Sequence, residues 1–135
     1  MDSVSKLSKS ETEKSIDATN YRKKVGCLRY LLHTRPDLYD CVGVLSRYMQ
    51  DPKESHGVAM KQCLRYLQGT TSYGLTFNSA SAREPVRLLG FSDSSHNVDP
   101  DDGKSTTGHV FYLGKCPITW CSQKQETVAL SSCEA

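Results

Sequence analysis

The spacing of the apolar residues changes near Thr70, and this change constrains the fold more than any other feature of the 135-residue sequence. Before Thr70 the apolar residues recur at intervals of three and four, which is the period of an amphipathic helix. After it they alternate with small or polar residues, as in Tyr73, Leu75 and Phe77, which is the period of a strand. The sequence therefore predicts an α+β fold in which a three-helix segment is followed by an antiparallel sheet.

A proline separates the first two predicted helices. The apolar face that starts at Tyr21 predicts a first helix over 19–33. Pro36 suits the first turn of a helix and disfavours helix in the residue before it, so a second helix is expected to begin there. The residues expected on the buried faces of these two helices are Tyr21, Val25, Leu28, Leu32, Leu38, Cys41, Val42, Leu45, Tyr48 and Met49.

The third predicted helix carries signals at both ends. Asp51, Pro52 and Glu54 form a variant of the capping box, with an acid at the N-cap, proline at the first helical position and glutamate at the third. Gly69 stands at the C′ position, where helices commonly end. The side chains expected to face inward are those of Ala59, Met60, Cys63, Leu64 and Leu67.

The second half of the chain predicts short strands and a closing helix. Gly114 and Lys115 mark a tight turn between the last two strands. Polar segments over 78–85 and 94–108 are predicted to be loops. The predicted strands cover 73–77, 86–92, 109–113 and 117–122, and the predicted helix begins at Thr127 and runs to Ala135.

Residues 1–18 lack periodicity and are rich in Ser, Lys and Glu, which predicts a disordered tail. This segment has no apolar core of the kind found in a signal peptide, and no run in the chain approaches the ~20 apolar residues of a membrane span. We therefore expect no membrane partner and an intracellular location, in the cytoplasm or the nucleus. The six cysteines form no CxxC pair and have no histidine at zinc spacing, so they are expected to be reduced and structural.

Positive charge is concentrated in the first half. Up to Thr70 there are 12 lysine and arginine residues against 8 acids, although the whole chain carries only +2. Four of these cations, Arg22, Lys23, Lys24 and Arg29, lie largely off the apolar face of the first predicted helix. They could contact the phosphate backbone of a nucleic acid, and a solvated helix face accounts for them equally well.

Two acids are candidates for a metal site. Asp93 follows an apolar strand-like run, and Glu134 lies in the first turn of the last predicted helix. Carboxylates at the mouth of a sheet can hold divalent metals for phosphate chemistry, but the same residues also fit a turn-initiating Asp and a helix-start acid. Asp99, Asp101 and Asp102 suggest a cation loop, yet they lack the EF-hand spacing, which favours a solvated turn.

Seven stretches, in collinear order, resemble the Pol polyprotein of copia-type retrotransposons. The matching stretches are Tyr21-Arg22-Lys23-Lys24-Val25-Gly26, His33-Thr34-Arg35-Pro36-Asp37, Val44-Leu45-Ser46-Arg47-Tyr48-Met49, Leu64-Arg65-Tyr66-Leu67-Gln68-Gly69-Thr70, Phe91-Ser92-Asp93-Ser94, Asp102-Gly103-Lys104-Ser105-Thr106-Thr107-Gly108 and Val128-Ala129-Leu130-Ser131-Ser132-Cys133-Glu134-Ala135. The resemblance implies that 19–70 is the end of a reverse transcriptase. It also implies that 71–135 is the opening of a ribonuclease H domain, truncated and therefore with an incomplete ribonuclease H-like sheet.

The resemblance assigns roles to the two acids. It implies that Asp93 and Glu134 are the first and second ligands of a two-Mg²⁺ site whose other two acids would lie beyond Ala135. On this interpretation Mg²⁺ belongs only to a complete ribonuclease H domain, no cofactor is bound stably, and the chain alone is not an enzyme. Its expected partner is an RNA–DNA hybrid or another nucleic acid. The chain departs from the family pattern at Ser95-His96, where the family has Asp-Trp, at Gly57, where it has Trp, and at Gly103, where it has Arg.

Two alternative functions remain open from the sequence. The chain could form part of an active Mg²⁺-dependent ribonuclease H when it is continued or complemented. It is also similar to copia-derived proteins described as secreted RxLR-type effectors of oomycetes, which implies secretion into a host plant cell, host protein partners and suppression of cell death. The effector motif itself is not matched, because Cys27-Leu28-Arg29 and Cys63-Leu64-Arg65 share only its last two residues.

Overall fold

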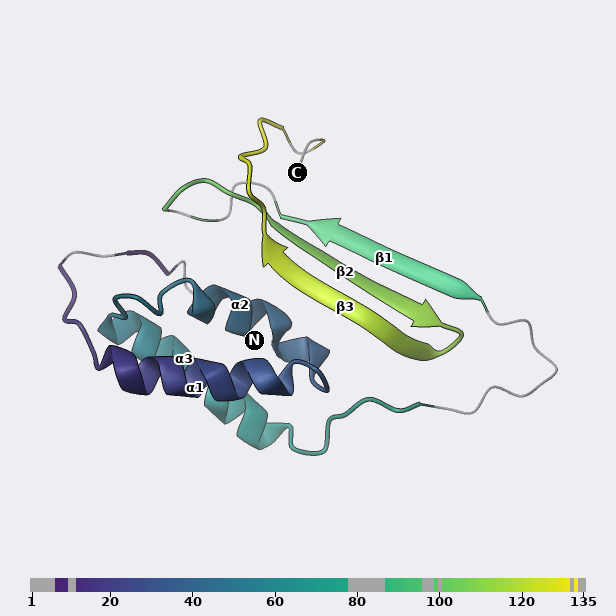
Figure 1. The fold of residues 1–135 in the computed structure, drawn as a ribbon, viewed down its shortest axis with the longest axis horizontal. Coiled ribbons are helices and arrows are strands. Elements are labelled where there is room, and N and C mark those ends of the chain that lie inside the picture. Colours follow the sequence, from purple (N-terminus) through teal and green to yellow (C-terminus); the bar gives the residue numbers. More distant parts are fainter. Residues whose placement is uncertain are drawn as a thin grey trace.

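A computed structural model describes residues 7–9, 12–77, 87–95, 99, 101–131 and 133. In this part of the chain three α-helices precede a three-stranded antiparallel sheet (Figure 1), which confirms the α+β class. The predicted loop over 78–85 and the two last residues, Glu134 and Ala135, lie outside the described residues.

The three helices begin and end within a few residues of the predicted positions. Helix α1 spans Ala18–Leu31, and the Oδ1 atom of Asp17 caps it by accepting the backbone N–H of Thr19 at 2.8 Å. A 3₁₀ turn, η1 (Pro36–Leu38), leads into α2 (Tyr39–Ser46), and α3 spans Glu54–Gly69. The proline restart and the end of α3 at Gly69 are therefore confirmed, but Gly69 is the last helical residue and Thr70 is the C-cap, so the predicted C′ position of Gly69 is wrong.

The start of α3 differs from the predicted capping box. Lys53 occupies the N-cap, and its backbone N–H donates to the His56 ring Nδ1 at 2.9 Å. The His56 ring is fully buried and stacks on Tyr48, with ring centroids 3.9 Å apart. Asp51 instead accepts the Ser15 hydroxyl and pairs with Lys53. The sequence pattern does not indicate His56 as a capping residue. Its ring can accept the backbone N–H of Lys53 because the fold holds the ring in place in the core.

The helices share one hydrophobic core. Its buried members are Tyr21, Val25, Leu28, Leu38, Cys41, Val42, Leu45, Met60 and Cys63. The Tyr21 hydroxyl donates to the Leu45 carbonyl at 3.0 Å, so the one polar atom that α1 brings into this core is satisfied. The prediction was wrong for Leu64, which is 37% exposed because it lies at the edge of the inward face of α3.

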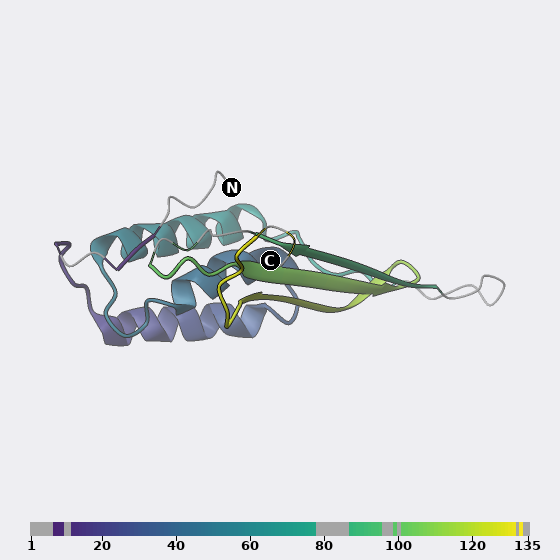
Figure 2. The same ribbon diagram turned by 90° about the horizontal axis from the view of Figure 1, so that it is seen from above.

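The sheet has the order β1-β2-β3, with β1 at Leu88–Ser94, β2 at Thr106–Leu113 and β3 at Cys116–Lys124. The last two strands turn at Gly114, whose φ of 63° lies in the left-handed region that glycine adopts without strain. Helix α2 packs on β3, and the strands extend past the ends of the helices (Figure 2).

Two predicted elements are wrong. Residues 73–77 form no strand, and the side chains of Tyr73 and Phe77 are 60% and 65% exposed. Alternation of apolar and polar residues is not sufficient for a strand, because a strand also needs backbone hydrogen bonds to an adjacent strand. None of the described strands pairs with this segment. Residues 127–131 form no helix either. A helix this short needs packing to be stable, and Val128 and Leu130 are largely exposed.

Part of the predicted tail is packed onto the helices. Leu7 is buried, and its carbonyl accepts the Tyr48 hydroxyl at 2.7 Å. Ser15 forms an isolated antiparallel bridge with Lys53, and the backbone N–H of Ile16 donates to Pro52 at 2.9 Å. These contacts do not fit a disordered tail over residues 7–9 and 12–17. None of the described helices is long and apolar enough to cross a membrane.

Candidate functional site

The exposed side of α1 carries four cations, Arg22, Lys23, Lys24 and Arg29, which we call the basic face. The opposite side of the helix is buried in the core, so the packing of that side fixes the direction of the basic face. None of the four forms an ion pair with another described residue, and among their side chains only that of Arg22 hydrogen-bonds a described residue, at a long 3.4 Å to the Met49 carbonyl. The basic face is therefore available to an external anion.

Aromatic side chains lie beside Arg29 at the end of the basic face. Arg29, Tyr30, His33 and Trp120 line a shallow hollow of about 680 Å³. The Tyr30 ring is 79% exposed and meets the His33 ring edge to face, with centroids 6.3 Å apart. Exposed aromatic rings next to cations are the side chains on which unpaired bases stack. No local sequence pattern indicates this hollow, because Trp120 is far from Arg29 and Tyr30 in the chain.

Trp120 connects the sheet to α1. Its indole Nε1–H donates to the carbonyl of Leu32, just after α1, at 2.9 Å. The last carbonyls of a helix have no partner within the helix, so this bond satisfies one of them. Trp120 is half-buried, and through this bond it links β3 to the end of α1.

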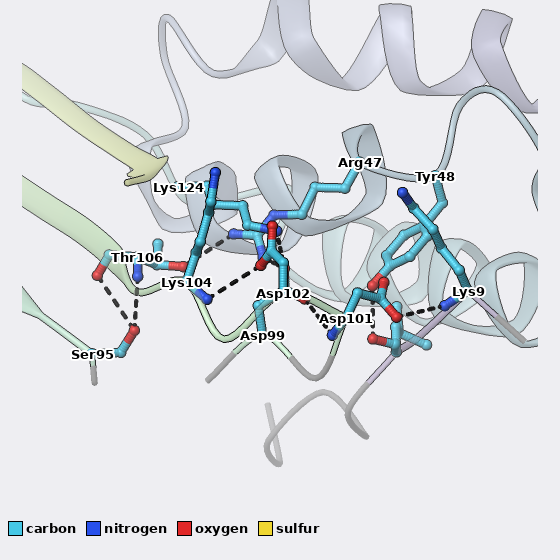
Figure 3. A network of polar contacts seen from close by, with 11 residues as sticks. Lys9, Arg47, Tyr48, Ser95, Asp99, Asp101, Asp102, Lys104, Thr106 and Lys124 are labelled. Atoms are coloured by element: carbon cyan, nitrogen blue, oxygen red, sulfur yellow. Dashed lines mark hydrogen bonds and ion pairs between the residues drawn. The ribbon is translucent and has the colours of Figure 1, made fainter. Parts of the chain in front are cut away.

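Asp99 forms a second link, which we call the Asp99 junction (Figure 3). The Asp99 side chain is only 3% exposed and receives Arg47, which follows α2, at 2.8 Å and Lys124, the last residue of β3. Arg47 also donates to the Thr106 hydroxyl at 3.0 Å, and Lys124 also pairs with Asp102 at 2.8 Å. The junction therefore fastens the end of α2 to the ends of β2 and β3.

Electrostatics hold Asp99 in its charged form. Burial by itself raises the pKa of this carboxyl group, but the Lys124 ammonium, the backbone N–H of Asp101 and the Arg47 guanidinium together lower the pKa below its usual value. The prediction of a solvated turn is wrong for Asp99, because the residue as a whole is only 6% exposed. A cation loop does not fit either, because two cationic side chains already occupy the carboxylate.

Asp93 lies on β1, where it pairs with Gly108 of β2, and its side chain is exposed. It lines a shallow depression of about 490 Å³ together with Asp37, Asp40 and His109. Asp37 is not free to bind a metal, because Arg35 donates to both of its oxygens, at 2.9 and 2.7 Å. This bidentate contact lowers the pKa of Asp37.

The described residues do not supply a magnesium site. Mg²⁺ takes six oxygen ligands and is usually held by carboxylates together with substrate phosphates and water. No group of three or more His, Cys, Asp or Glu side chains within the described part of the chain could hold a metal ion. Asp93 alone does not fit Mg²⁺, and Glu134 lies outside the described residues.

The relatives of the chain decide its family. It is 43% identical, over 96% of its length, to the retrovirus-related Pol polyprotein from transposon RE1 of Arabidopsis thaliana. It is 41% identical, over 85% of its length, to the corresponding polyprotein from transposon TNT 1-94 of Nicotiana tabacum. A third relative, secreted RxLR effector protein 161 of Plasmopara viticola, is 45% identical, and the match covers 84% of this chain and 79% of that protein. The chain belongs to the copia-type Pol family.

This copia-type Pol chain corresponds to a small part of the transposon proteins. It spans 9% of the RE1 polyprotein and 8% of the TNT 1-94 polyprotein. No family model matches it, and no solved structure matches it. The relatives confirm that it is a Pol-derived fragment.

Of the two predicted sites, only the basic face lies wholly within the described residues. The four cations of the basic face are spread around the exposed part of α1, from Lys24 beside α3 to Arg29 beside the aromatic hollow at β3. Asp93 lies on β1, at the far edge of the sheet from β3. The basic face is thus the more complete of the two candidate sites in this copia-type Pol chain.

Proposed function

We propose that this Pol-derived fragment binds the phosphate backbone of nucleic acids, RNA–DNA hybrids included, through the basic face of α1, and that it does not cleave them on its own. The observation that carries the proposal is the set of four exposed cations that have no ion-pair partner among the described residues. Unpaired cations on a rigid helix attract phosphates without regard to base sequence.

The length of the basic face suits a nucleic-acid backbone. From Arg22 to Arg29 the helix rises about 10 Å, at 1.5 Å per residue. A duplex carries one phosphate charge per ~1.7 Å of axis, so this length faces about six charges. Four cations can therefore form up to four phosphate contacts, and the log–log salt dependence of binding to duplex DNA should have a slope no steeper than about −3.6.

The lack of a cluster of metal ligands within the described residues supports the proposed lack of cleavage. Hydrolysis of a phosphodiester by two metal ions needs a cluster of carboxylates that holds both ions about 3.5–4 Å apart. Asp93 is the one described residue at a position the family resemblance assigns to this cluster. We propose that the antiparallel β1-β2-β3 sheet is the beginning of a ribonuclease H-like sheet whose catalytic site needs further residues.

Salt titrations of binding test the proposal. A fluorescently labelled RNA–DNA hybrid and a matching DNA duplex are titrated with the chain at several salt concentrations, and anisotropy reports binding. In the variant Lys23→Gln/Lys24→Gln/Arg29→Gln, the slope on duplex DNA should fall by about 2.7, because three contacts are lost.

A matched control separates local contacts from net charge. Arg65, Arg87 and Lys115 are exposed and lie outside α1, so changing all three to Gln removes the same total charge. This control should retain the wild-type slope. Equal losses in both triple variants, or no wild-type binding at low salt, would contradict the proposal.

A second function is favoured by the close match in length to secreted RxLR effector protein 161, of which this chain covers 79%. We propose as the alternative that the chain acts inside a host plant cell on proteins that control cell death. Expression in leaves beside a cell-death inducer tests this function. Suppression of cell death that survives in the triple variant Lys23→Gln/Lys24→Gln/Arg29→Gln would favour the effector function over nucleic-acid binding, and no suppression would exclude it.

A further inference from the structure

Two cysteines meet in the core between α2 and α3. The Sγ atoms of Cys41 and Cys63 lie 3.3 Å apart and share a hydrogen bond. The two residues are 6% and 1% exposed, and both belong to the core cluster. The four other cysteines lie outside this cluster. The pair is therefore the place in the described chain where two thiols are already positioned for a reaction with each other.

We propose that Cys41 and Cys63 form a site of reversible oxidation, at which a hydroperoxide converts the two thiols into a disulfide that joins α2 to α3. The sulfurs must approach by little more than 1 Å to reach the ~2.05 Å of an S–S bond.

The reaction balances with one molecule of hydrogen peroxide per disulfide. The Cys63 thiolate attacks a peroxide oxygen, the O–O bond breaks, and the leaving hydroxide takes a proton to become water, which leaves Cys63 as a sulfenic acid. The Cys41 sulfur then attacks the Cys63 sulfur, and the S–O bond breaks as the S–S bond forms. The departing hydroxide takes the Cys41 proton and becomes a second molecule of water. The two thiols together lose two electrons and two protons.

The contact between the thiols supports this order of events. The hydrogen bond to Cys63 raises the pKa of the Cys41 thiol, and burial raises it further. The same hydrogen bond lowers the pKa of the Cys63 thiol. Cys63 is therefore the thiol that ionises first, and the thiolate is the nucleophile in such reactions. Because both sulfurs are buried, the rate depends on brief local opening of the helices, which admits an oxidant close to water in size.

The disulfide should stabilise the helical part of the chain. It closes a loop between residues 22 positions apart, and the loss of freedom in the unfolded chain should raise the melting temperature by roughly 10 °C. The crosslink lies within the core against which α1 packs, so it would hold α2 against α3 without involving the basic face.

The test uses the whole chain with the other four cysteines changed: Cys27→Ser, Cys116→Ser, Cys121→Ser and Cys133→Ser. After treatment with hydrogen peroxide, the intact mass should fall by two hydrogen atoms, and peptide mapping should place the bond between Cys41 and Cys63. The melting temperature should rise and should return to its starting value with a thiol reductant. The matched control, which also carries Cys41→Ser, should gain oxygen at Cys63 and form no intramolecular bond.

Two results would overturn the proposal. The first is an absence of the crosslink in the folded chain together with its formation in urea, which would show that the core holds the sulfurs apart. The second is a crosslink that lowers the melting temperature. If the four-serine chain does not fold, peptide mapping of the oxidised wild-type chain decides the matter, and a disulfide between any other two cysteines counts against the proposal.

Discussion

Replacement of Asp99 by asparagine tests the link between the helices and the sheet. Asp99→Asn retains the shape of the side chain but removes the negative charge that faces Arg47 and Lys124. The hydrogen bond that Oδ1 accepts from the backbone N–H of Asp101, at 2.9 Å, can still be accepted by the amide oxygen of the variant. The substitution therefore isolates the two charged contacts, each of which would contribute about 1.5–3 kcal/mol if it were fully buried.

Exposure of the partners reduces this estimate. The side chains of Arg47 and Lys124 are 20% and 26% exposed, so water can solvate part of each charge when Asp99 is neutral. Arg47 also retains the Thr106 hydroxyl, and Lys124 retains Asp102. We expect Asp99→Asn to lower the free energy of unfolding by about 2–4 kcal/mol, a range shifted by about 1 kcal/mol below the roughly 3–5 kcal/mol lost when a fully buried pair loses one partner.

Urea unfolding followed by circular dichroism measures the effect. The matched control is Asp102→Asn, which removes the same charge from the same loop but from an exposed side chain that pairs only with Lys124. The control should change the unfolding midpoint little, because exposed ion pairs contribute little. Equal midpoints for the two variants would refute the role assigned to the Asp99 junction.

Three further changes follow from the same contacts. Leu45→Ala should cost roughly 2–5 kcal/mol in urea unfolding, because Leu45 is 2% exposed in the core, and a change within ~0.5 kcal/mol would mean that this face is wrongly placed. Trp120→Phe should lower the free energy of unfolding by about 0.5–1.5 kcal/mol, since the Leu32 carbonyl loses its donor. An unchanged thermal melt would mean that water takes the place of the indole N–H. The pKa of Asp99 is lowered in the folded chain, so its stabilisation should be complete above the ordinary Asp pKa of about 3.9 and be lost as the pH falls further. Melting temperatures of wild type and Asp99→Asn measured against pH should therefore converge in acid, and a constant difference would contradict the lowered pKa.

Local patterns were sufficient to predict the helices and most of the sheet. The period of the apolar residues located the core positions from Tyr21 to Cys63, because a buried helical face leaves that period in the sequence. The turn at Gly114 was also predictable from its residues. The basic face of α1 followed from the same helical geometry, since residues that are not buried must lie on the other side.

Contacts between distant residues could not be predicted in this way. The Asp99 junction joins residues 52 and 25 positions apart, and the Trp120 link spans 88. No local pattern distinguishes Asp99 from its exposed neighbour Asp102, and only the fold places two cations beside one of them. The segment at 73–77 shows the converse, because its alternation resembles that of a strand although no described neighbour pairs with it.

The most direct test of the proposed function follows one labelled RNA–DNA hybrid for both binding and cleavage. The purified chain is incubated with the hybrid and millimolar Mg²⁺ or Mn²⁺, and samples are analysed by anisotropy and on a denaturing gel. We predict salt-sensitive binding with the hybrid intact, because Asp93 is exposed and has no cluster of metal ligands among the described residues. Cleavage that disappears in Asp93→Asn would contradict this account, and it would show that the remaining ligands come from residues outside the described part or from a second chain.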